Sequence, residues 1–448
     1  MKTKISTEIS NNMMLKKLLP FLAIIFAAAI LSGCDKSSPT SPSASPSIVE
    51  GRVVGSASST GNMQKSSSTQ SGIQGATVIL ASIKSDGSLQ TVSNAAVQTD
   101  VNGKFDVETN LNGISNLVVI ASQGSSHWKA VVTSQVQSGL KVFSEPLDDQ
   151  TTIKTDIYIK AKEHNHDNVT YAEIDNYISS DIATEIEADT TMEDDIEASI
   201  NAEANAEVDA FSDSSIGMSQ GQWQTVIGGK EDAEISLERN LYFANNQSDD
   251  DAAENSYYKG VVNAFINAGL SAGTCIKLME ISQRAFINSL TGLNAQIAFS
   301  FEQRSQEIKA IVTNYAVQSN FISLGASQTQ ISDAATAGDN LVVSIKNALT
   351  ISDIDNAYET YRSAIESDIP VLLGINSNMM TNMDASLAGY RTVLQAAVSS
   401  NVSFAALVKA YSAFYSSVKT EMAMVMNPAN GAHINAAAET MMILYANF

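Results

Sequence analysis

The chain has 448 residues, of which 44% are hydrophobic, and its net charge is −22. This length is enough for two or three domains with cores of their own, and the hydrophobic share is too low for a protein that crosses a membrane many times. The negative charge excludes nucleic acid as a partner, because a polyanion would be repelled. With only two cysteines, the chain cannot be a scaffold stapled by several disulfides.

The N-terminal segment has the organisation of an export signal. Lys16 and Lys17 end a positively charged start, and a run of apolar and small residues, Leu18–Leu31, follows with Pro20 as its only interruption. Fourteen helical residues would span roughly 21 Å, which is short of the ~30 Å hydrocarbon core of a bilayer. The run therefore predicts a cleaved signal peptide over residues 1–33 rather than a membrane-spanning helix.

The run ends in Leu31-Ser32-Gly33-Cys34, which resembles the lipobox of bacterial lipoproteins. The resemblance implies cleavage before Cys34, diacylation of its sulfur and, in many cases, acylation of the new amine. Two or more acyl chains anchor a protein stably where a single chain is marginal. We therefore expect the lipid bilayer as a partner and the cell envelope as the location. The inner and outer membranes, and a periplasmic or cell-surface orientation, stay open as alternatives. Residues 34–47 predict a Ser/Pro-rich linker.

Residues 48–160 predict a domain of short β-strands separated by turns of Gly, Asn, Asp and Ser. The predicted strands are Ile48–Gly55, Ala76–Ser82, Leu89–Gln98, Lys104–Val107, Leu117–Gln123, Trp128–Val132 and Thr151–Ile159. Ile153, Ile157 and Ile159 show the alternation of a half-buried strand. Asn102-Gly103 predicts a hairpin turn with positive φ angles. Seven short strands indicate a β-sandwich, with His127 at its edge.

Three short motifs give this domain a family resemblance. They are Gly51-x-Val53, Gly75-Ala76-Thr77-Val78 and Thr99-Asp100-Val101-Asn102-Gly103-Lys104-Phe105. Together they resemble the carboxypeptidase regulatory-like domain, which has a transthyretin-like sandwich, over a quarter of the chain. A Ser-rich insert between Ser56 and Gly72 departs from the family pattern. Domains of this family are non-catalytic companions of exported enzymes, transporters and adhesins, so the resemblance implies a folding or spacing module.

Residues 161–251 predict an acidic amphipathic helix followed by a connector. Residues 161–254 hold 24 acidic and 3 basic residues, a net charge of −21. Apolar side chains from Tyr171 to Phe211 recur every three, four or six residues, as on one face of a helix, and Asp189-Thr190-Thr191 is a candidate break. Ser219–Asp251 is interpreted as a connector with short helical pieces. The acidic face is expected to be solvated; a calcium-binding surface is the alternative, although no EF-hand loop is present.

Residues 252–448 predict an α-helical bundle, because they contain only two prolines and many Ala, Ser, Asn and Gln residues. The predicted helices lie near 252–290, 292–323, 328–349, 352–367, 371–399, 402–426 and 431–446. Short connections between them favour antiparallel packing. Met422 and Met426 share a helix face, whereas Met424 points away, so the first two are expected in the core. Cys275 is expected to be a buried small hydrophobe.

The most suggestive cluster for chemistry is Glu163-His164-Asn165-His166-Asp167. An H-x-H pair leaving a strand places both imidazoles on one face, where they can bind zinc or copper together with a carboxylate. The candidate metal ligands are therefore His164, His166, Glu163 and Asp167. The alternative is a polar junction between domains that binds nothing.

The fold class that follows is multidomain α+β, with an N-terminal seven-stranded β-sandwich and then a mostly α-helical bundle. No nucleophile motif, phosphate loop or HExxH sequence occurs, so no catalytic residue and no cofactor is predicted. We expect a non-enzymatic, membrane-anchored envelope lipoprotein. Its sandwich would be a spacer, and its helical domain would bind an unknown envelope protein or polymer. The alternative is an envelope enzyme or metal-binding protein that uses residues 163–167.

Overall fold

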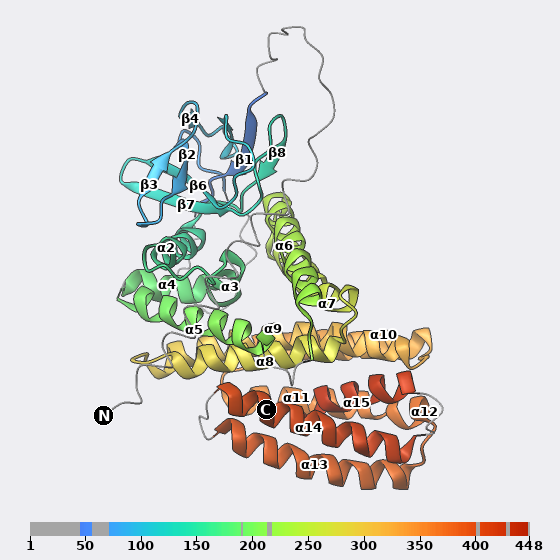
Figure 1. The fold of residues 1–448 in the computed structure, drawn as a ribbon. Coiled ribbons are helices and arrows are strands. Elements are labelled where there is room, and N and C mark those ends of the chain that lie inside the picture. The colour runs from blue at the N-terminus through green and yellow to red at the C-terminus, as the bar shows by residue number, and fades with distance from the viewer. Residues whose placement is uncertain are drawn as a thin grey trace, which may run out of the picture. The chain divides into compact units, whose positions relative to one another are not determined.

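A computed structural model describes residues 45–55, 71–189, 191–212, 217–399, 404–426 and 431–446. The predicted signal peptide, Cys34 and residues 35–44 of the predicted linker lie outside the described residues, as do residues 56–70 of the Ser-rich insert. Within the described part, an N-terminal β region of two sheets precedes a mostly helical part (Figure 1). This order agrees with the predicted α+β arrangement.

The β region contains eight strands in two sheets. They are β1 (Ser47–Arg52), β2 (Thr77–Ile83), β3 (Leu89–Thr91), β4 (Val97–Gln98), β5 (Lys104–Thr109), β6 (Leu117–Gln123), β7 (Ser126–Val132) and β8 (Lys141–Phe143). One sheet has the order β5-β1-β8; the other has the order β3-β2-β6-β7, with β4 also paired to β2. β1 is antiparallel to β5 but parallel to β8. Val49 and Val107 of the first sheet share one hydrophobic cluster with Leu80 and Val119 of the second.

The predicted count of seven strands is not confirmed. Leu89–Gln98 contains two short strands instead of one, and β8 was not predicted. The predicted strand Thr151–Ile159 is wrong, because these residues lie in helix α2 (Asp149–Glu163). The remaining predicted strands each contain or overlap an observed one.

Helix α2 forms because a capping box and a helical spacing of buried isoleucines outweigh the strand-like alternation of its apolar residues. The side chain of Asp148 accepts a hydrogen bond from the backbone N–H of Thr151. The hydroxyl oxygen of Thr151 in turn accepts one from the backbone N–H of Asp148, which makes a capping box. Ile153 and Ile157 are four residues apart and buried, as on one face of a helix, whereas Ile159 is only half-buried. The helix lies against β7, where the Lys129 N–H donates to the Thr152 hydroxyl at 3.0 Å.

The predicted hairpin turn at residues 100–103 is a tight turn between the two sheets. The Gly103 N–H donates to the Asp100 carbonyl at 3.0 Å, and only Gly103 has a positive φ angle, 76°. β4 pairs with β2 and β5 pairs with β1, so the turn carries the chain from one sheet to the other. A Cβ at Gly103 would lie 2.2 Å from the Val53 carbonyl oxygen, which explains why glycine is required there.

The predicted long acidic helix is three helices, α3 (Tyr171–Tyr177), α4 (Ser180–Ala188) and α5 (Met192–Ser212). The second break coincides with the predicted one, and the first is an additional break at Ile178, where Ser179 caps α4. The predicted connector is wrong, because α6 (Gln220–Phe243) is a continuous helix of 24 residues. A Cβ at Gly229 would lie 2.5 Å from the Ala264 Cβ, so glycine at this position permits close packing of α6 against the helix that contains Ala264.

Most of the remaining helices follow the predicted ranges, but two predicted helices are each divided in two. The predicted helix 252–290 is wrong, because Gly269 has a positive φ angle of 73° and Ser271 caps a new helix. The predicted helix 371–399 is interrupted at Gly374, which has a φ angle of 66°.

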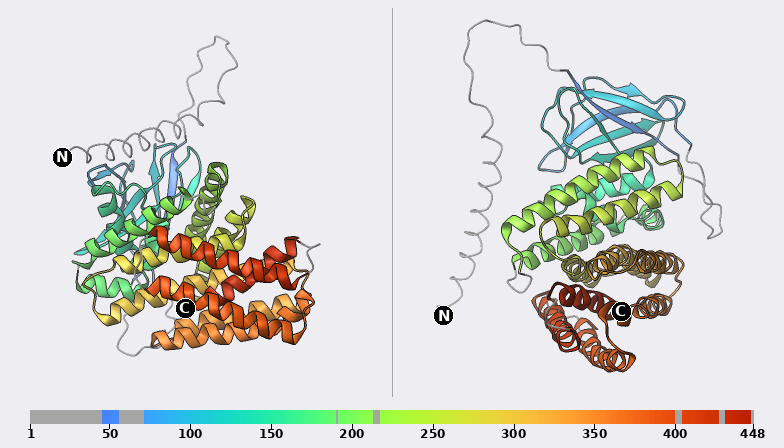
Figure 2. Two further views of the ribbon diagram at one scale, coloured as in Figure 1. Left: turned by 60° about the horizontal axis from the view of Figure 1, so that its bottom comes forward. Right: turned by 90° about the vertical axis from the view of Figure 1, so that its right-hand side faces the viewer.

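The remaining helices are α7 (Gln247–Asn267), α8 (Ala272–Ser289), α9 (Ala295–Ser323), α10 (Gln328–Lys346), α11 (Ile351–Glu366), α12 (Ile369–Leu373), α13 (Ser377–Ser399), α14 (Phe404–Val425) and α15 (Gly431–Ala446). α15 packs against α8, α9 and α14 (Figure 2). Met422, Met426 and Cys275 are buried and Met424 is exposed, which confirms the predicted core positions.

Candidate metal centre

The end of α2 brings His164 and His166 together. His164 is the C-cap of the helix, and Asn165 then adopts a left-handed conformation with φ 59°. Asparagine tolerates this conformation better than most residues do. The chain turns back, the His166 N–H donates to the Ala161 carbonyl, and the two imidazole centroids lie 5.6 Å apart. The two rings lie close together, as predicted. The end of a helix brings them together, however, and not the end of a strand.

The carboxylate in this group is Glu197 of α5, which sequence reasoning missed. Its Oε2 lies 3.1 Å from Nδ1 of His164, and its Oε1 lies 2.5 Å from Nδ1 of His166. The Glu197 side chain is only 1% exposed, whereas the histidine side chains are 45% and 29% exposed. Ligand atoms of the three residues all lie within 4.8 Å of one another. The carboxylate thus forms the floor of the group and the imidazoles form its solvent side.

The other two predicted ligands do not join this group. Glu163 is exposed at the last position of α2, and its Cβ lies 2.9 Å from where a Cβ of Gly87 would stand, so it contacts the turn between β2 and β3. Asp167 is exposed and near Lys162. The structure therefore keeps His164 and His166 as candidate ligands and replaces Glu163 and Asp167 by Glu197.

Two features of α5 hold Glu197 in place. Ile196 and Ile200 are buried in the cluster that α2 to α5 share with the facing ends of α8 and α9. One turn before Glu197, Lys160 of α2 forms ion pairs with Glu193 at 3.0 Å and Asp194 at 2.7 Å. A sequence signal for Glu197 does exist, because it directly follows the apolar stripe residue Ile196 and therefore lies at the edge of the buried face.

The geometry is close to that of a zinc or copper site. Metal–nitrogen and metal–oxygen bonds of about 2.0–2.2 Å in a tetrahedral site place ligand atoms roughly 3.3–3.5 Å apart. The observed contacts between Glu197 and the imidazoles, 3.1 Å and 2.5 Å, are shorter and have the spacing of hydrogen bonds. Binding of a metal ion would therefore require the two imidazoles, which are partly exposed, to move away from Glu197.

A second group of buried carboxyls lies deeper, where the β region meets the helices. We call Glu145, Lys154, Asp175, Glu234 and Glu238 the junction cluster. Lys154 Nζ contacts Asp175 and lies 3.4 Å from Glu145 Oε2. Glu238 accepts from the Thr133 N–H at 2.8 Å and from the Ser134 hydroxyl at 3.1 Å. Two of the four carboxyl groups, those of Glu145 and Asp175, therefore contact the ammonium group.

Protons balance the charge of the junction cluster. Burial raises the pKa of Glu145 to about 8 and that of Glu238 to about 7, and burial also places the pKa of Glu234 well above its ordinary value. Among the described residues, no three of these carboxyls offer ligand atoms close enough to share a metal ion. The junction cluster therefore does not form a second candidate metal centre.

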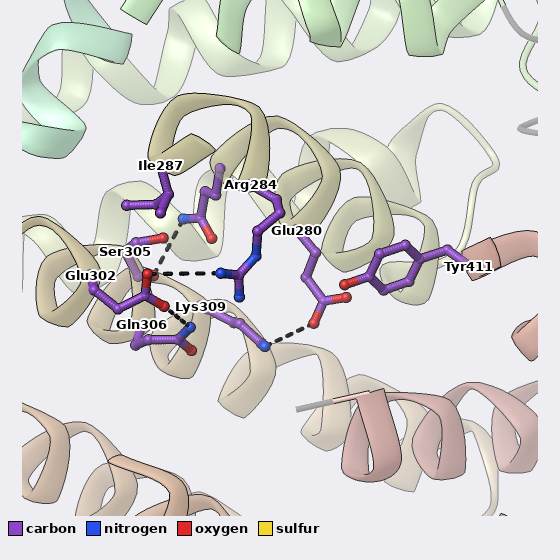
Figure 3. Close-up of a pocket in the computed structure, with 9 residues that line it drawn as sticks. Glu280, Arg284, Ile287, Glu302, Ser305, Gln306, Lys309 and Tyr411 are labelled. Carbon is purple, nitrogen blue, oxygen red and sulfur yellow. Dashed lines mark hydrogen bonds and ion pairs between the residues drawn. The ribbon is translucent and has the colours of Figure 1, made fainter. Parts of the chain in front are cut away.

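A third polar site lies between α8, α9 and α14 (Figure 3). Its charges neutralise one another, since Lys309 pairs with Glu280 at 3.0 Å and Arg284 with Glu302 at 3.8 Å. Its interior space of about 10 Å³ is enough for roughly one water molecule. This pocket therefore fits no ligand larger than water.

Comparison with models of protein families, with curated proteins and with solved structures returns no match for this chain. Among the described helices, none is by itself long and apolar enough to cross a membrane. One bent pair, Ser248–Asn267 with Ala272–Ser289, meets the length and composition criteria together.

Proposed function

We propose that this protein is a non-enzymatic cell-envelope lipoprotein that binds one transition-metal ion at His164, His166 and Glu197. Acyl chains on Cys34 anchor it to a membrane. In this proposal the two sheets form a sandwich of the carboxypeptidase regulatory-like type, which acts as a spacer, and the helical part is a surface for an envelope protein or polymer. The sequence motifs support the anchor and the spacer, and the geometry of the three-residue group supports the metal ion.

The observation that carries the metal assignment is the buried carboxylate of Glu197. Among the described residues, its ion-pair partners are the two imidazoles alone, without a lysine or arginine. A buried carboxylate needs a cation or strong donors nearby. Two imidazole nitrogens and one carboxylate oxygen form a donor set that suits Zn²⁺ and Cu²⁺.

Metal binding is tested on the full chain, purified in detergent with a histidine-free tag and stripped with a chelator. Isothermal titration with Zn²⁺ should give one site per chain. His164→Ala, His166→Ala and Glu197→Gln should each weaken binding at least about tenfold, because each removes a ligand. His127→Ala is the matched control, since His127 is exposed on the edge strand β7 and lies outside the group. Equal binding by all four variants, or no binding by the parent, contradicts the assignment.

The lipid anchor is tested separately by metabolic labelling with an alkyne fatty acid. Cys34→Ser should lose the label and either leave the membrane fraction or accumulate as a precursor. Cys275→Ser is the matched control and should keep the label, because Cys275 is buried in the helical core. A Cys34→Ser variant that stays labelled and is processed normally would show that the lipobox interpretation is wrong.

A further inference from the structure

The metal centre has three protein donors and one open side. Glu197 is buried beneath the group, and the two imidazoles line the side that faces solvent. Within the described part of the chain, no fourth His, Cys, Asp or Glu offers an atom within the same reach. Zinc sites with three protein ligands keep a fourth position for water or for a ligand from outside.

The carboxylates nearest to the open side are already engaged. Lys160 holds Glu193 and Asp194, which are the two acidic residues of α5 one turn before Glu197. Glu163 contacts the turn between β2 and β3, as described above. The fourth donor must therefore come from outside these side chains.

Charge indicates which outside donor fits. Glu163, Asp167 and Asp194 are exposed next to or within one turn of the three ligands, in a segment, residues 161–254, whose net charge is −21. An anionic donor approaching this surface is repelled within a Debye length of about 8 Å at physiological ionic strength. A neutral imidazole nitrogen meets no such barrier, and it is a preferred ligand of both zinc and copper.

We propose that the fourth position of this metal centre accepts the imidazole of a histidine side chain on a partner protein. The inference rests on the proposed metal site, and it gives the protein a way to join a partner through a shared ion. Coordination then forms one new metal–nitrogen bond and displaces one water molecule. No electron is transferred and no covalent bond of the protein breaks.

The test uses the full chain in detergent, loaded with one equivalent of Cu²⁺ and followed by electron paramagnetic resonance. Without additions, the spectrum should show coupling to two nitrogens. Imidazole, or a short peptide with one histidine, should add a third nitrogen with at least tenfold tighter binding than azide. The same peptide with alanine in place of histidine should have no effect.

Asp167→Asn distinguishes an outside donor from an inside one, because Asp167 is exposed next to His166 and lies outside the three-residue group. If the fourth donor is external, this variant keeps the parent spectrum and the parent response to imidazole. A spectrum changed by Asp167→Asn, or one that imidazole leaves unchanged, overturns the inference while the metal site itself stands. A response to imidazole but not to the histidine peptide overturns the partner side chain as the donor. Failure to bind copper at all overturns both proposals.

Discussion

The candidate metal centre and the junction cluster both bury carboxylates, but they neutralise them in different ways. Glu197 lies beneath two partly exposed imidazoles, so its partners are in contact with solvent. In the junction cluster Lys154 is itself only 4% exposed, and four carboxyl groups are present with this one lysine. The comparison indicates that the depth of a buried carboxylate determines which cation balances its charge. Near the surface a metal ion can exchange with protons, whereas in the interior only protons and a fixed lysine are available.

The sharpest test of this comparison is removal of the buried ammonium. Lys154→Met leaves Glu145 and Asp175 without their cation and should lower the free energy of unfolding by about 3–5 kcal/mol at pH 7.5. Lys129→Met is the matched control, because Lys129 and its partner Asp156 are both partly exposed. That change should cost no more than about 1 kcal/mol. Urea denaturation measures both, and similar small losses would show that the junction cluster does not depend on its lysine.

The pH dependence of stability should reflect the protons in the junction cluster. Because burial raises the pKa of Glu145 to about 8 and of Glu238 to about 7, the folded state holds more protons than the unfolded state above pH ~4.5. The free energy of unfolding should therefore fall as pH rises from about 5 to 8, by an amount on the order of a few kcal/mol.

Urea denaturation at several pH values checks this slope. Glu145→Gln should make it shallower, because one of the groups that release a proton is then gone. A free energy of unfolding that rises between pH 5 and 8 would contradict the assignment of protons to this cluster.

A smaller effect is expected where a carboxyl of the junction cluster accepts a hydrogen bond from the backbone. Glu238→Ala leaves the Thr133 N–H without its acceptor and should cost about 1–3 kcal/mol. Glu238→Gln keeps an oxygen for that N–H and buries no charge, so at pH 8 it should cost less than the alanine variant. Thermal unfolding compares the two, and equal losses would show that the hydrogen bond to the β region contributes little.

The smallest effect is expected on the solvated acidic face. Glu187 is exposed on α4 and has no ion-pair partner among the described residues. Glu187→Gln should change the free energy of unfolding by no more than about 0.5 kcal/mol. Thermal unfolding with and without millimolar calcium is the measurement. A calcium-induced rise in melting temperature that this variant abolishes would instead indicate a calcium site.

The sequence predicts the helices of the C-terminal part well and the elements near the domain junction poorly. Long amphipathic segments such as α9 and α15 have their own periodicity, so their limits agree with the prediction to within about three residues. α2 was predicted as a strand because Ile153, Ile157 and Ile159 match the two-residue period of a strand. Ile153 and Ile157 also match the spacing of one helix face. α6 was predicted as part of a connector because Ser219–Asp251 contains glycine and asparagine residues, and Gly229 is one of these. The tertiary contact with Ala264 that favours glycine there is not visible in sequence.

The candidate site was predictable in part for a similar reason. His164 and His166 are two residues apart, so their proximity follows from almost any turn. Glu197 is 31 residues beyond His166, and its place after Ile196 indicates the edge of the buried face but not that the histidines lie opposite. Its place is fixed by how α5 packs on α2, through the ion pairs of Lys160 and the burial of Ile196. That packing is a tertiary property which periodicity alone does not specify.

The parallel pairing of β1 with β8 has a mechanical consequence. Ile48 lies opposite Lys141, and the bridge between Val53 and Leu147 extends the same pairing toward α2. A force on the chain before β1 enters that strand at its N-terminal end, whereas a force on the helices reaches β8 at its C-terminal end. In parallel strands these forces act along the strands in opposite directions. All the hydrogen bonds of the ladder then bear the load together in shear and do not open one after another. This pairing therefore resists forces that pull the N-terminal end of β1 away from the helices.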